Sequence, residues 1–141
     1  MSRVTSTGTP PVRRDRRRVR RGSVSLSLHV AIEYGVGVLT ILAPFLFSFE
    51  STAAELVSIL VGVGVLVLAV MTDAPTGIAR SLPVASHVVL DYVLALFLIV
   101  APFVFGFSGD DNAATAYFIV LGVGYVMLAV LTRYRGPKPA G

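Results

Sequence analysis

Two segments of the chain carry the same pattern of residues, so the sequence is an internal duplication. The first segment begins HVAIEY, continues through APFLFSF and ends GVGVLVLAVMT, and the second reads HVVLDY, APFVFGF and GVGYVMLAVLT. Matching positions lie 58 residues apart through the segments APFLFSF and APFVFGF and 60 residues apart beyond them, which indicates a two-residue insertion in the second copy. Each copy contains two long apolar stretches, so one structural unit is expected to occur twice.

The apolar stretches are long enough to cross a membrane. Hydrophobic residues make up 55% of the 141 residues, and the mean hydropathy is +0.80, which is too apolar for a soluble domain of this size. Four stretches, roughly 28–49, 53–71, 84–107 and 113–131, approach the length of about 20 residues that a membrane-spanning helix needs. They lack the alternation of a β-barrel strand. We therefore predict an all-α membrane protein with four transmembrane helices.

Short turns within each copy predict two helical hairpins. Because both hairpins begin on the same side of the membrane, they are parallel rather than inverted repeats. The predicted division of the chain is a disordered basic tail at 1–22, a first hairpin repeat at 23–72, a linker at 73–83, a second hairpin repeat at 84–132 and a basic tail at 133–141.

The basic residues indicate the orientation. Eight of the twelve precede residue 22, and the others lie in the linker or after the last stretch, whereas the turns carry only acidic residues (Glu50, Glu55, Asp110 and Asp111). The positive-inside rule then predicts a multi-pass protein of the cytoplasmic (inner) membrane with both termini in the cytoplasm. We expect the Arg-rich tail to contact anionic lipid headgroups and not nucleic acid, since no aromatic residue interleaves the arginines.

One polar pattern recurs within the apolar stretches. A histidine is followed four residues later by a carboxylate, which places both on one helix face, and a tyrosine follows directly. The candidate functional or registry residues are His29, Glu33, Tyr34, His87, Asp91 and Tyr92. Three interpretations remain open: interfacial anchors, contacts that fix helix registry, and a proton or cation relay.

No further chemistry is required by these residues. Two histidines and two carboxylates could in principle hold a metal ion, but nothing in the sequence requires one. Cysteine is absent, and no nucleophile stands at a credible spacing from a base. We therefore expect no metal, no cofactor and no catalytic residues.

Two further repeated features carry structural expectations. Pro44 and Pro102 remove one backbone donor near the outer end of each odd-numbered helix, and the phenylalanines that follow, beginning with Phe45 and Phe103, are expected to form a plug or an interfacial belt. The paired glycines are expected to let helices pack closely. These are Gly62, Gly64, Gly122 and Gly124.

The chain resembles the SPW-repeat family of small prokaryotic membrane proteins. The resemblance rests on the duplication, on the proline followed by Phe-x-Phe, and on the acidic residue and tyrosine near each helix start, and it covers residues 29–134. The Ser-Pro-Trp motif of that family stands here as Ala-Pro-Phe in both copies. The resemblance implies a tandem two-helix repeat and no established activity, so it supplies no catalytic residues.

Two functions remain in view. We expect a non-enzymatic structural or interaction component of the membrane, which self-associates or joins a partner membrane protein. The alternative is an oligomeric proton- or cation-coupled transporter or channel that uses the paired histidines and carboxylates.

Overall fold

A computed structural model describes residues 23–134 as four helices and two very short strands. The helices are α1 (Leu26–Leu46), α2 (Thr52–Met71), α3 (Val84–Val104) and α4 (Asn112–Leu131), and the strands are β1 (Val24–Ser25) and β2 (Thr132–Arg133). All four helices are long and apolar enough to cross a membrane, which confirms the predicted fold class. The tail at 1–22 and the C-terminal segment from residue 135 lie outside the described residues.

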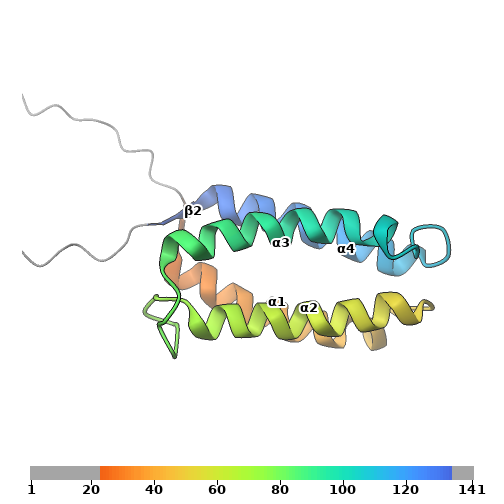
Figure 1. Cartoon of the computed structure of the whole chain (residues 1–141), viewed down its shortest axis with the longest axis horizontal. Helices are drawn as coiled ribbons and strands as arrows, with labels where there is room; N and C mark the ends of the chain where they lie inside the picture. The colour runs from red at the N-terminus through yellow and green to blue at the C-terminus, as the bar shows by residue number, and fades with distance from the viewer. Residues whose placement is uncertain (1–22, 135–141) are drawn as a thin grey trace, which may run out of the picture.

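The helices form two hairpins that lie side by side (Figure 1). Most of the backbone contacts between helices join α1 to α2 and α3 to α4. Both α1 and α3 begin at the end of the bundle that carries β1, β2 and the linker, so the repeats are parallel (Figure 1). We call this the linker end, and we call the opposite end, where the two hairpins turn, the turn end.

Short backbone pairings tie the hairpins together at the linker end. Val24, before α1, pairs in parallel with Thr132, after α4. Leu82, before α3, forms a parallel bridge with Thr72, after α2. The residue that enters each hairpin therefore pairs with the residue that leaves the other, as expected for two repeats related by a pseudo-twofold axis.

The first and third helices end earlier than predicted. The apolar stretches suggested ends near residues 49 and 107, whereas α1 ends at Leu46 and α3 at Val104. Ser48 and Gly106 stand at equivalent positions just beyond and adopt left-handed backbone conformations, with φ of 52° and 74°. Such a residue commonly ends a helix, and the apolar composition of the turn hides it from hydropathy.

Pro44 creates a hydrogen-bond vacancy that the second helix fills. Proline has no N–H group, so it cannot donate to the carbonyl of Thr40, four residues earlier. The hydroxyl of Ser58, in α2, donates to that carbonyl over 2.6 Å. The corresponding position in the second repeat is Phe118, which packs in the core.

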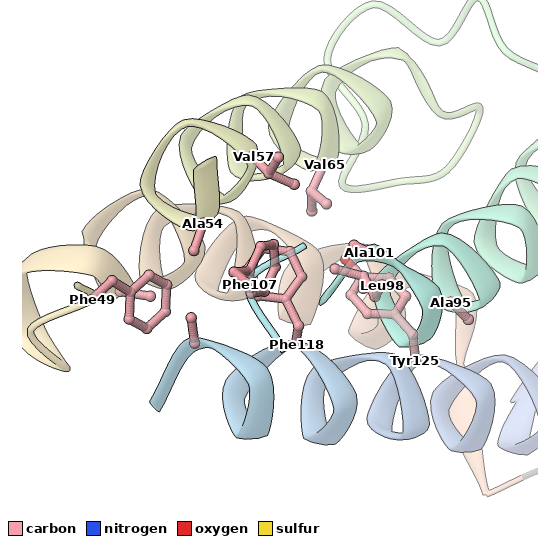
Figure 2. Packing of buried hydrophobic residues seen from close by; sticks show 12 residues of the cluster. Phe49, Ala54, Val57, Val65, Ala95, Leu98, Ala101, Phe107, Phe118 and Tyr125 are labelled. Atoms are coloured by element: carbon pink, nitrogen blue, oxygen red, sulfur yellow. The ribbon is translucent and has the colours of Figure 1, made fainter. Parts of the chain in front are cut away.

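The phenylalanines after each proline divide into outward and inward positions. Phe45 and Phe103 are 72% and 62% exposed, whereas Phe49 and Phe107 are buried. Phe107 stacks edge-on against Phe118 with ring centroids 5.3 Å apart. Figure 2 shows the buried side chains in a row between α2 and α4. The row runs from Phe49, which lies near the turn end, to Tyr125. The inner phenylalanines therefore plug the turn end, and the outer ones face the surroundings of the bundle.

The two glycines of each pair differ in their surroundings: one lies at a close helix contact and the other is exposed. A Cβ atom on Gly62 would lie 2.7 Å from the carbonyl oxygen of Gly37, and one on Gly122 would lie 2.9 Å from that of Ala95, so both sit at close helix crossings. Gly64 and Gly124 are exposed, with nothing within 4 Å of a built Cβ. The packing role predicted for these two is wrong within this chain, because residues two apart on a helix do not face the same neighbour.

Candidate functional site

The repeated histidines and carboxylates meet between the hairpins. Each of the four side chains is fully buried, at 0% exposure. Two come from the first half of α1 and two from the first half of α3, near the linker end. We call them the polar cluster: His29, Glu33, His87 and Asp91.

Each histidine of the polar cluster lies between both carboxylates. The Nε2 atom of His29 is 3.7 Å from Oε1 of Glu33 and 3.3 Å from Oδ2 of Asp91. The Nε2 atom of His87 is 3.5 Å from Oε2 of Glu33 and 3.5 Å from Oδ2 of Asp91. The two imidazole rings meet edge to face, with centroids 5.4 Å apart. The cluster is therefore one joint site and not two separate pairs, which argues against the interpretation as interfacial anchors.

Two threonine hydroxyls form hydrogen bonds with the Nδ1 atoms of the histidines, the ring nitrogens that do not face the carboxylates. Nδ1 of His29 lies 2.7 Å from the hydroxyl of Thr132, and Nδ1 of His87 lies 2.8 Å from that of Thr72. Each of these hydroxyls donates its hydrogen to the carbonyl four residues earlier in its helix, over 2.6 Å in both cases. A hydroxyl has one hydrogen to donate, so each threonine accepts from the histidine, and Nδ1 carries the proton.

This tautomer leaves the inner nitrogen of each neutral ring free. Within residues 23–134, neither histidine Nε2 atom has a hydrogen-bond partner, and neither oxygen of Glu33 has one. Oδ1 of Asp91 is also unpaired. A buried polar group without a partner is costly, and most native proteins satisfy such groups. The cluster therefore contains five buried polar atoms without a hydrogen-bond partner among the described residues.

Tyr134 satisfies one oxygen of the cluster. Its hydroxyl donates to Oδ2 of Asp91 over 3.1 Å. Burial raises the pKa of Tyr134, and the neighbouring Asp91 raises it further, so the hydroxyl remains a donor. The sequence-predicted tyrosines do not join the cluster: Tyr34 donates to the carbonyl of Thr76 in the linker, and Tyr92 is exposed.

A family model of the SPW repeat domain matches residues 27–132, which include all four residues of the polar cluster. The chain belongs to the SPW repeat family. No curated protein and no solved structure gives a significant match. Together with the four apolar helices, membership identifies a small multi-pass membrane protein, as the sequence predicted.

The two SPW repeats also touch at the turn end, through Asp111. Oδ2 of this buried carboxylate accepts the backbone N–H groups of Glu50 and Ser51, over 2.8 and 3.0 Å, and Oδ1 accepts that of Ala114 over 2.8 Å. Burial opposes ionisation here, but the N–H groups of Ala114, Ser51 and Glu50 lower the pKa of Asp111 below its ordinary value. Asp111 therefore caps α4 and clamps the α1–α2 turn of the other SPW repeat.

Sequence reasoning missed four of the residues that organise these two ends. Thr72 and Thr132 recur at matching positions of the SPW repeats, and that recurrence was the available signal for a role at the site. Tyr134 and Asp111 have no counterpart of the same chemistry, since Ala74 and Ser51 stand at the matching positions. No repeat pattern could have identified them.

Proposed function

We propose that the chain is a non-enzymatic structural or interaction protein of the cytoplasmic membrane, in which the polar cluster joins the two hairpins. The observation that carries this proposal is that each histidine is supported by a threonine of the other repeat, which we call the exchange of supports. Thr132 of the second repeat holds His29 of the first, and Thr72 of the first holds His87 of the second. The shortest histidine–carboxylate distance also crosses between repeats, from His29 to Asp91 at 3.3 Å.

Burial supports a role without catalysis or transport. All four side chains of the polar cluster have no exposed surface, so a substrate has no access to them in this conformation. The helix faces that point outward carry large apolar side chains, such as Leu60 and Val104 at 71% and 72% exposure. These faces suit lipid, a second copy or another membrane helix.

The orientation forms part of the proposal, with both termini in the cytoplasm. Arg80 and Arg133 lie at the linker end, and Glu50, Asp110 and Asp111 lie at the turn end, which supports the positive-inside assignment. A reporter enzyme that is active only in the periplasm, fused after residue 141, should be silent. The same reporter inserted at Gly109 should be active, and the reverse pattern would overturn the assignment.

One observation favours proton or cation transport as the alternative. The unpaired atoms of Glu33, Asp91 and both histidines could pass a proton or a cation along the bundle. Transport would require the cluster to open to water on each side in turn.

Flux in liposomes separates the two functions. We expect the wild-type protein to carry no proton or cation flux above that of empty liposomes, while Glu33→Gln/Asp91→Asn weakens its stability or its assembly. The matched control is Glu50→Gln/Asp110→Asn, which removes the same two charges at exposed positions. A pH-dependent flux that is present in the wild type and the control and lost in the cluster variant would overturn the structural role.

A further inference from the structure

We propose that the polar cluster binds one divalent transition-metal ion, and that Zn²⁺ fits it best. The inference deepens the structural role proposed above and rests on it, because a metal that clamps the two hairpins must remain in place. Each residue of the cluster offers one ligand atom, and these atoms all lie within 4.8 Å of one another. Two are imidazole nitrogens and two are carboxylate oxygens, one of each from either repeat.

The distances match ligands around a metal better than they match hydrogen bonds. A charge-assisted N–H···O bond spans about 2.7–2.9 Å. In the cluster, the four distances between a histidine Nε2 and a carboxylate oxygen run from 3.3 to 3.7 Å, with Oε1 of Glu33 nearer His29 and Oε2 nearer His87, and the four ligand atoms all lie within 4.8 Å of one another. A tetrahedral Zn²⁺ ion with bonds of about 2.0–2.2 Å would hold its ligand atoms about 3.3–3.5 Å apart. The separation therefore leaves room for an ion at the centre.

The position of the proton on each histidine ring also favours a metal ion at the centre of the cluster. Because each Nδ1–H donates to a threonine, the lone pair of each neutral ring lies on Nε2, which faces the carboxylates. A histidine that binds a metal usually donates its other ring N–H to a supporting acceptor. Thr132 and Thr72 occupy the place of that acceptor for His29 and His87.

Charge balance favours a divalent ion. Two ionised carboxylates and two neutral histidines carry a charge of two negative units, and a buried charge is costly inside a membrane bundle. One divalent cation makes the site neutral and supplies a partner for the unpaired Nε2 atoms of both histidines and for Glu33. Mg²⁺ and Ca²⁺ prefer six or more oxygen ligands, whereas imidazole together with carboxylate suits Zn²⁺ or Fe²⁺.

The closed shape of the site indicates a structural ion. Catalytic zinc sites keep an open position for water or substrate, whereas structural sites use four protein ligands. All four side chains here are fully buried, and two belong to each hairpin. A hollow of about 540 Å³ at the linker end is lined by Asp73 and Arg133, the chain neighbours of Thr72 and Thr132.

Direct metal analysis of the full chain tests this inference. The protein is purified in detergent, stripped with EDTA, loaded with ZnCl₂ and freed of unbound metal, and its zinc is then counted by elemental mass spectrometry. We expect one zinc ion per chain, and a thermal unfolding midpoint that rises on loading and falls again with EDTA. Glu33→Gln/Asp91→Asn should hold no zinc, whereas Glu33→Asp, which copies the acid of the second repeat, should retain it.

The supporting threonines give a second test with a matched control. Thr72→Val should weaken zinc affinity about 10–100-fold while circular dichroism shows the fold intact, as expected when the group behind a metal-bound histidine is lost. Thr40→Val removes a buried threonine hydroxyl that also donates to the carbonyl four residues earlier, but away from the cluster. It should bind zinc as the wild type does.

The outcomes distinguish the metal site from the structural role. Zinc at the same level in wild type and in Glu33→Gln/Asp91→Asn would overturn the site, and the structural role would stand if liposomes show no flux. One bound zinc per chain with zinc flux across liposomes would support the site and overturn the structural role. Equal affinity of Thr72→Val and Thr40→Val would contradict the support of a metal-bound His87 by Thr72 and would overturn the site as described.

Discussion

Both ends of the bundle bury carboxylates between the hairpins, but the carboxylates differ in how many hydrogen-bond partners they have. At the turn end, both oxygens of Asp111 accept backbone N–H groups from three residues. At the linker end, Glu33 has no hydrogen-bond partner on either oxygen within the described chain, and Asp91 has one only on Oδ2. Backbone donors are thus sufficient to join the hairpins at the turn end, and the unpaired groups at the linker end are consistent with the proposed metal site.

The largest expected effect comes from breaking the cluster. In metal-free protein, His29→Leu should lower the free energy of unfolding by about 3–5 kcal/mol, because it removes a basic side chain 3.3 Å from Oδ2 of Asp91, beside two buried carboxylates. Denaturant unfolding in detergent micelles measures this loss. Leucine at all four cluster positions should restore wild-type stability, since a well-packed apolar replacement removes the uncompensated charges. If the fourfold variant is less stable than the wild type, the polar cluster stabilises the contact between the hairpins, as Asp111 does at the turn end.

A smaller loss is expected at the turn end. Asp111→Ala removes three hydrogen bonds to a charged group and should cost about 2–3 kcal/mol. Ser51→Ala removes only the cap of α2, a bond of 3.4 Å to Ala54, and should cost about 0.5–1 kcal/mol. The same unfolding assay compares them. Equal costs would mean that the contact of Asp111 with the other hairpin contributes nothing.

Glycine substitutions compare how tightly the two ends are packed. A Cβ atom on Gly77 would lie 1.8 Å from the carbonyl oxygen of Thr72, so Gly77→Ala should cost about 1–2 kcal/mol and displace the support of His87. Gly109, at the turn end, has nothing within 4 Å, so Gly109→Ala should change stability by less than about 0.5 kcal/mol. A tolerated Gly77→Ala would show that the linker does not position Thr72.

The smallest effect is a dependence on pH at the turn end. The pKa of Asp111 is lowered in the folded chain, so its ionised form adds stability that is present above the ordinary pKa of about 3.9 and is lost as pH falls through the folded value. The stability difference between wild type and Asp111→Asn should therefore be largest near neutral pH and shrink on acidification below about pH 4. A difference that grows on acidification would contradict the role of the carboxylate.

Hydropathy and repetition were sufficient to predict the helices and the two parallel hairpins. The four-residue spacing also placed His29 beside Glu33, and His87 beside Asp91. The meeting of these pairs across the hairpins could not be predicted, because apolar length does not show which faces of two hairpins meet. The close approach at Gly62 and the outward direction of Gly64 likewise depend on which face the neighbouring helix covers.

The exchange of supports at the linker end bears on how such a chain could arise. One repeat supplies a histidine and an acid from its first helix, but the threonine behind that histidine comes from the other repeat. A lone hairpin therefore encodes half a centre, and two identical copies in the same orientation would complete two equivalent halves. Joining the copies in one chain frees the halves to diverge. Glu33 opposite Asp91, and Ala74 where the other half has Tyr134, record that divergence.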